Sequence, residues 1–137
     1  MFLQFYKPQD ALKEIINNFM INQIDFDPSQ PKASFPFPPL PEHCLFFYPY
    51  DCMEVAYQST NTQKLGSCIV VGPQPQKLTL TKGYHHLSIH VGFQPGGLYW
   101  LLGIQMQDLL RLEACEECQW LCTYILESNA TFWEANF

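Results

Sequence analysis

Two turns rich in glycine and proline constrain the fold of this chain more than any other feature of its sequence. The first is Val71-Gly72-Pro73-Gln74, and the second is Phe93-Gln94-Pro95-Gly96-Gly97. Between them, apolar and polar residues alternate with the two-residue period of a β-strand that has one buried face. After the second turn, a leucine-rich run has helical spacing and ends at Gly103. The segment therefore predicts strands followed directly by a helix.

The residues between these turns predict two strands joined by a hairpin. Residues 77–81 alternate, with Leu78 and Leu80 on one face, and Lys82-Gly83 is typical of a hairpin turn. The next strand, from His86 to Phe93, has two chemically different faces. One face carries Leu87, Ile89, Val91 and Phe93, and the other carries His86, Ser88, His90 and Gly92.

The N-terminal segment predicts a strand, a helix and a second strand. Residues 2–6 are strand-like, and Pro8 and Asp10 suit the start of a helix. The spacing of one buried helical stripe follows at Leu12, Ile15, Ile16 and Phe19. Residues 20–26 then alternate again, which indicates a return to a sheet.

Six prolines between Asp27 and Pro41 exclude a helix there and disfavour a central strand. Two interpretations compete: a linker between two domains, or a long loop with an edge strand inside one domain. The apolar residues Phe35, Phe37 and Leu40 favour the loop with an edge strand, as does the short segment that precedes it.

The remainder of the chain predicts more strands and then helices. Residues 43–58 are aromatic and strand-like with a break near Pro49, and residues 68–71 form a short apolar run. Beyond Gly103, apolar residues again recur at helical spacing. A chain of 137 residues is long enough for one domain with a substantial core. We therefore expect a mainly β domain with C-terminal helices, an α+β class.

Composition and charge exclude several classes of function. The formal net charge is −6, which disfavours nucleic-acid contact by this chain itself, because phosphate binding needs clustered Lys and Arg. No apolar run reaches the length of a membrane span. The residues from Met1 to Asp10 lack the pattern of a signal peptide, which predicts a cytoplasmic protein. The six cysteines are then expected to be free thiols rather than a disulfide framework.

A cysteine motif near the C-terminus has two readings. Cys115-x-x-Cys118-x-x-x-Cys122 offers three thiolates that could bind a metal. The same spacing is produced by one face of a helix, on which cysteine behaves as a small apolar residue. We favour the second reading, a packed or subunit-contacting face that consists of Cys115, Cys118, Leu121, Cys122 and Ile125.

The histidines do not predict a metal site by themselves. His86 and His90 are four residues apart on one strand, about 13 Å at ~3.3 Å per residue, which is too far to share one ion. His85 points to the opposite face of that strand. Ordinary hydrogen-bonded histidines are the simpler interpretation, although either ring could join ligands from another strand.

The other patterns of catalytic chemistry are missing. The sequence contains no Gly-x-Ser-x-Gly nucleophile motif, no glycine-rich phosphate loop and no regularly spaced pair of carboxylates. We therefore predict no catalytic residue and no cofactor. Aromatic residues in the 46–57 segment could instead line a small-molecule pocket, for which plain core packing is the alternative.

The sequence resembles the N-terminal domain of AraC/XylS-type transcriptional regulators over most of its length up to about Leu112. The shared elements are Leu40-Pro41-Glu42-His43-Cys44, Val71-Gly72-Pro73-Gln74 and, most specifically, Phe93-x-Pro-Gly-Gly followed by Leu101-Leu102-Gly103. Gln94 and Gln105 depart from that pattern, because the family often has Arg and Pro at these positions.

This resemblance implies a cupin-like β-barrel or sandwich followed by two or three helices. Residues 1–112 would be the sensor domain, and residues 113–137 a helical dimerisation or linker segment of the same structural domain. The function implied is effector sensing and homodimerisation, with DNA binding left to a C-terminal helix-turn-helix region that this chain does not include. The predicted pocket residues are Phe47, Tyr48, Tyr57, His86, His90 and Trp100.

Two other functions remain open at this stage. A metal-dependent cupin-type enzyme would require His43, His86 or His90 to converge with Glu42 or Glu54. A purely structural dimerisation module would fill the interior of the barrel with its own side chains.

Overall fold

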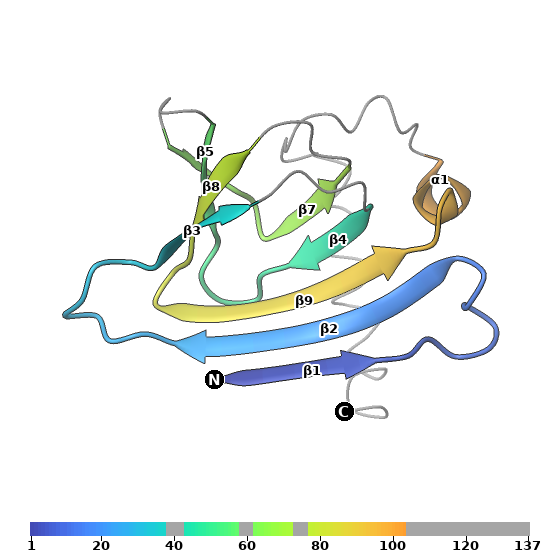
Figure 1. Cartoon of the computed structure of the whole chain (residues 1–137), viewed down its shortest axis with the longest axis horizontal. Coiled ribbons are helices and arrows are strands. Elements are labelled where there is room, and N and C mark those ends of the chain that lie inside the picture. The colour runs from blue at the N-terminus through green and yellow to red at the C-terminus, as the bar shows by residue number, and fades with distance from the viewer. Residues whose placement is uncertain (38–42, 58–61, 73–76, 104–137) are drawn as a thin grey trace.

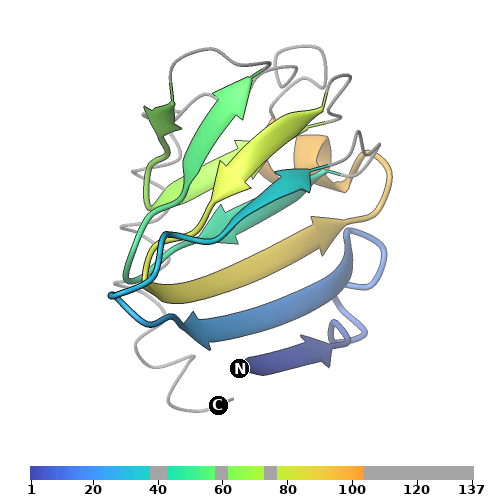
Figure 2. The same ribbon diagram turned by 60° about the vertical axis from the view of Figure 1, so that its left-hand side comes forward.

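The computed structural model describes residues 1–37, 43–57, 62–72 and 77–103, with the side chain of Tyr57 excepted. Within these ranges the chain forms strands arranged in two antiparallel sheets, and one short helix (Figures 1 and 2). The elements are β1 (Phe2–Tyr6), β2 (Ile16–Asp25), β3 (Ser34–Phe37), β4 (Cys44–Phe47), β5 (Glu54–Tyr57), β6 (Gln63–Lys64), β7 (Cys68–Val71), β8 (Leu78–Thr81), β9 (His85–Phe93) and α1 (Gly97–Leu102).

The larger sheet has five strands in the order β1-β2-β9-β4-β7, and the smaller has four in the order β3-β8-β5-β6. The long strands β2 and β9 pair from Ile16↔Phe93 to Asp25↔His85 and form the centre of the larger sheet. The smaller sheet lies over one face of the larger sheet (Figure 2). No strand pairing joins the two sheets in the described ranges, so the β-structure is not a closed barrel. The mainly β class expected from the sequence is confirmed.

Strand alternation gives the larger sheet two different apolar faces. The face toward the smaller sheet carries Cys44, Ile69 and Val71, which pack with Val55, Leu78 and Leu80 of the other sheet. The opposite, outer face belongs to a second cluster, which consists of Ile16, Leu45, Phe47, Cys68, Val70, Phe93 and Leu98. The fold therefore has one core between the sheets and one on the outer face.

The short helix α1 closes part of the outer cluster. It starts immediately after Gly96, whose φ of 78° lies in the left-handed region, and it ends at Gly103, which has a φ of 68°. Leu98 is 1 % exposed and packs in the outer cluster. Leu101, which the helical spacing predicted on the same face as Leu98, is half exposed instead. The predicted turn from strand to helix is otherwise confirmed.

The helix predicted over residues 12–19 is wrong. Only a single turn forms, with the amides of Ile15 and Ile16 both bonded to the carbonyl of Leu12. The strand β2 begins at Ile16 and pairs with β1 on one side and β9 on the other. These strand pairings provide hydrogen bonds for the backbone of β2, which is ten residues long. The pairings outweigh the helical spacing of the four apolar side chains, which is a coincidence.

The hairpin predicted at Lys82-Gly83 is also wrong, because β8 and β9 belong to different sheets. The amide of Lys82 donates to the carbonyl of Ala33, and the carbonyl of Tyr84 accepts from the amide of Phe26. Asp51 lies against Gly83 and its Oδ2 accepts the amide of His85 at 2.8 Å. The segment 82–84 is thus a crossover between sheets.

The prediction for the proline-rich segment is confirmed. The proline-rich segment does supply an edge strand, β3, in which Phe35 and Phe37 face inward and Pro36 is exposed. The part of the chain that the structure describes contains no helix long and apolar enough to span a membrane.

Candidate functional site

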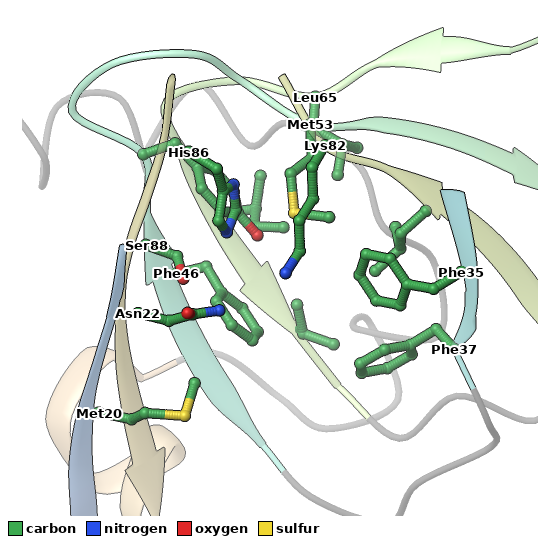
Figure 3. A pocket seen from close by; sticks show the side chains of 14 residues that line it. Met20, Asn22, Phe35, Phe37, Phe46, Met53, Leu65, Lys82, His86 and Ser88 are labelled. Carbon is green, nitrogen blue, oxygen red and sulfur yellow. The ribbon is translucent and has the colours of Figure 1, made fainter. Parts of the chain in front are cut away.

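A cavity of about 190 Å³ lies between the two sheets (Figure 3). Strands of both sheets contribute to its walls, because their inward-facing residues converge where the sheets face each other. The lining side chains are Met20, Asn22, Phe35, Phe37, Phe46, Tyr48, Met53, Leu65, Ile69, Val71, Leu80, Lys82, His86 and Ser88. Most of this lining is apolar or aromatic, and four polar side chains interrupt it, which is the usual composition of a small-molecule site.

Three of the polar side chains come from neighbouring positions on β2 and β9. Asn22 pairs directly with Ser88, and His86 lies two residues before Ser88 on the same face of β9. The sequence correctly separates the two faces of β9, and the structure places the polar face inward. Ser88 is 3 % exposed and His86 is 2 % exposed, whereas Leu87 and Ile89 on the other face are only half-buried.

His86 is a buried and neutral imidazole at the edge of this polar strip. Desolvation lowers its pKa to about 4, the nearby positive charge of Lys82 contributes in the same direction, and Asp51 opposes them. Its ring centroid lies 6.0 Å from that of Tyr48. No group in the described ranges hydrogen-bonds to its Nδ1. A buried ring nitrogen without a partner is costly, so it marks a position where a polar atom of a ligand would be stabilised.

Lys82 supplies the positive charge of the cavity. Its amine extends into the cavity in Figure 3 and lies 5.0 Å from the centre of the Phe35 ring. Burial lowers the pKa of this amine. Within the described ranges Lys32 pairs with Glu54, and His85 contacts Asp25 in an ion pair only when the imidazole is protonated. Lys82 has no carboxylate partner in these ranges.

The structure brings together only part of the predicted pocket. Tyr48 and His86 line the cavity, and His90 is buried close to it with its ring 4.8 Å from that of Phe46. Burial raises the pKa of Tyr48, so its hydroxyl stays neutral. Tyr57 ends β5, but its side chain is outside the described part of the structure.

Two predicted pocket residues do not line the cavity. Phe47 is buried in the outer cluster, because it follows Phe46 on β4 and successive residues of a strand point to opposite faces. Trp100 lies on α1 and is 82 % exposed. The prediction that Phe47 and Trp100 line a pocket therefore does not hold for this cavity.

Sequence reasoning missed Asn22, Phe35, Lys82 and Ser88. Asn22 and Ser88 lie on a polar face that could have been recognised as inward-facing if the two sheets had been anticipated. Lys82 was assigned to a hairpin turn, because Lys-Gly is typical of such a turn. Its true position depends on the crossover between sheets, for which no short sequence signal exists.

The candidate metal ligands that the structure describes do not converge. Among the residues that the structure describes, no group of three or more His, Cys, Asp or Glu side chains lies close enough to hold a metal ion. Among the described cysteines, Cys52 and Cys68 are free thiols. Glu42 and the predicted helical face of Cys115, Cys118, Leu121, Cys122 and Ile125 lie outside the described ranges.

Comparison of this chain with protein-family models, with curated proteins and with solved structures finds no match. The geometry of the cavity is therefore the basis on which a function can be argued.

Proposed function

We propose that this chain is a non-catalytic sensing domain that binds a small organic molecule between its two sheets. The observation that carries the proposal is the cavity of about 190 Å³, which is walled by aromatic and aliphatic side chains and contains a few convergent polar groups. A domain whose only task was structural would be expected to fill this space, since protein interiors are close-packed.

The resemblance of the sequence to the N-terminal domains of AraC/XylS-type regulators supports the same proposal. In that interpretation the two sheets form a cupin-like sandwich, the occupant of the cavity is the effector, and the C-terminal residues serve homodimerisation. DNA binding would belong to a separate helix-turn-helix region, in accordance with the net charge of −6 on this chain.

The strand β9 provides a physical route from the cavity to the C-terminal side. His86 and Ser88 of β9 line the cavity, and Phe93 at its end packs with Leu98 of α1 in the outer cluster. A ligand that contacts β9 would therefore favour one arrangement of β9 and α1 over others. Such a ligand can shift this equilibrium only by the difference in its affinity for the two arrangements.

The proposal predicts that small, mostly apolar molecules raise the thermal unfolding temperature of the protein. The probe set consists of neutral and charged aromatic and aliphatic compounds of about ten non-hydrogen atoms, because a cavity of ~150 Å³ is known to hold benzene. A ligand at 100 times its dissociation constant stabilises the folded state by about 2.7 kcal/mol, which a thermal melt detects.

Two adjacent residues of β8 provide a matched control for this experiment. Leu80 lines the cavity and Thr79 points to the solvent, so Leu80→Trp fills the cavity, whereas Thr79→Trp leaves it open. We expect the first variant to lose the thermal shift and the second to keep it. The sensing function is contradicted if no compound of the set shifts the wild-type melt, or if Leu80→Trp keeps every shift.

A further inference from the structure

Among the described residues that line the cavity, one carries a positive charge and none carries a negative charge. Lys82 is the only charged residue among them at neutral pH, because His86 is neutral there and no Asp or Glu is among the described lining residues. The nearby carboxylate of Glu54 is engaged at 2.7 Å by Lys32. A partly desolvated ammonium without a carboxylate partner is unfavourable, and an anion bound next to it would relieve that cost.

The surroundings of Lys82 restrict which anion can bind. Phe35 and Phe46 provide apolar walls near the amine (Figure 3), and Leu80 also lines the cavity. Burial between such walls strongly disfavours a doubly charged group that one ammonium cannot neutralise. A single negative charge matches a single ammonium. The rest of the ligand must be apolar, because apolar side chains supply most of the remaining wall.

Hydrogen-bonding groups are available for the second oxygen of such an anion. His86 presents a nitrogen without a described partner, and Asn22 and Ser88 lie on the same polar strip. In Figure 3 these side chains and the Lys82 amine all point toward the interior of the cavity. The imidazole can donate from Nδ1 in one tautomer, and amide and hydroxyl groups can donate as well. The cavity therefore combines one charge with several neutral donors.

We propose that the cavity binds a small monocarboxylate with an aromatic or aliphatic body, whose carboxylate pairs with Lys82 and whose body packs against Phe35, Phe46 and Leu80. This inference rests on the proposed sensing function and specifies the chemical class of the effector. The size of the cavity fits a ligand somewhat larger than benzene, since benzene occupies a cavity of ~150 Å³.

Titration calorimetry with matched ligands tests this proposal on the whole chain at pH 7. The probes are phenylacetate, its neutral isostere phenylacetamide and 2-phenylethanol, which share one body and differ at the polar end. Because a hydrogen bond to a charged group contributes more than a neutral one, we expect phenylacetate to bind about tenfold or more tightly than the two neutral probes.

Variants at two lysines connect this preference to Lys82. Lys82→Met keeps the unbranched stem and removes the charge, Lys82→Arg keeps the charge, and Lys77→Met alters an exposed lysine just before β8. We expect Lys82→Met to reduce the preference for phenylacetate over phenylacetamide to about twofold or less. We expect the other two variants to keep it. If Lys82→Met does not fold, the wild-type preference and its retention in Lys82→Arg still decide the question.

The outcomes separate this inference from the sensing function on which it rests. Equal binding of phenylacetate and phenylacetamide by the wild-type protein, or an undiminished preference in Lys82→Met, overturns the carboxylate assignment and leaves the sensing function standing. Absence of binding by all three probes also overturns the carboxylate assignment. The sensing function itself falls when the wider thermal-shift set fails as well, or when Leu80→Trp keeps every thermal shift.

Discussion

Lowering the pH from 6.5 to 4 is expected to decrease the free energy of unfolding by about 3 kcal/mol through His86 alone. The buried ring has a pKa of about 4, mainly because of desolvation, whereas a histidine in the unfolded chain titrates near 6.5. The unfolded state therefore binds the proton more readily. The contribution of His86 to stability is fully present above pH 6.5 and is lost as the pH falls toward the folded pKa.

Urea denaturation at several pH values measures this effect, and the neighbouring histidine provides the control. His85 precedes His86 on β9, but its side chain is 68 % exposed. We expect His86→Gln to flatten the dependence of stability on pH between 6.5 and 4, and His85→Gln to leave it steep. Burial also lowers the pKa of His43, so some dependence remains in His86→Gln. An equal slope in both variants would contradict the assignment.

The acid sensitivity of His86 and the anion site at Lys82 share one physical origin. Both groups are cationic when protonated, both are removed from water, and the charge on Lys82 helps to lower the pKa of His86. A carboxylate bound between them would oppose each of these shifts. A bound monocarboxylate is therefore expected to reduce the acid destabilisation, because it would raise the pKa of His86 back toward its ordinary value.

The sequence predicted the positions of the strands better than it predicted which strands pair with each other. Alternation correctly identified β9 and its two faces, and the prolines correctly limited β3 to a sheet edge. The helix predicted over residues 12–19 and the hairpin predicted at Lys82-Gly83 are both wrong, because a short stretch of sequence does not show which distant strand it pairs with. The apolar residues at 12–19 fit a helix, but β2 is stabilised by strands from both sides, one of which lies about 70 residues away in the sequence.

The same limit explains the incomplete prediction of the site. Tyr48 and His86, which the sequence predicted in a pocket, line the cavity, because aromatic and histidine side chains can be recognised directly in the sequence. Phe47 was misplaced because choosing a face requires knowing the register of β4. Lys82 and Phe35 meet because Lys82 directly follows β8, and β8 pairs with β3, which carries Phe35. That pairing of distant segments is a property of the tertiary structure.

Replacing Gly97 with alanine is expected to destabilise the fold by about 3 kcal/mol, which is near the upper end of the free-energy cost of adding a methyl group to a tightly packed position. A Cβ atom at this first position of α1 would overlap the carbonyl oxygen of Ile15 and crowd its carbonyl carbon. The backbone at Ile15 cannot easily move away from α1, because the same carbonyl accepts a hydrogen bond from the amide of Gln94 at 2.9 Å. Moving α1 instead would uncover Leu98, which is 1 % exposed.

The preceding glycine separates this steric effect from the conformational preference of glycine. Gly96 has a φ of 78°, but no atom lies within 4 Å of a Cβ built on it. Gly96→Ala should therefore cost only about 1 kcal/mol, the strain of a left-handed alanine. Urea denaturation measures the difference in the free energy of unfolding between the two variants. Equal midpoints would show that close packing of α1 against Ile15 does not require Gly97. Because α1 directly follows β9, which lines the cavity, Gly97→Ala is also expected to weaken the response of α1 to a ligand.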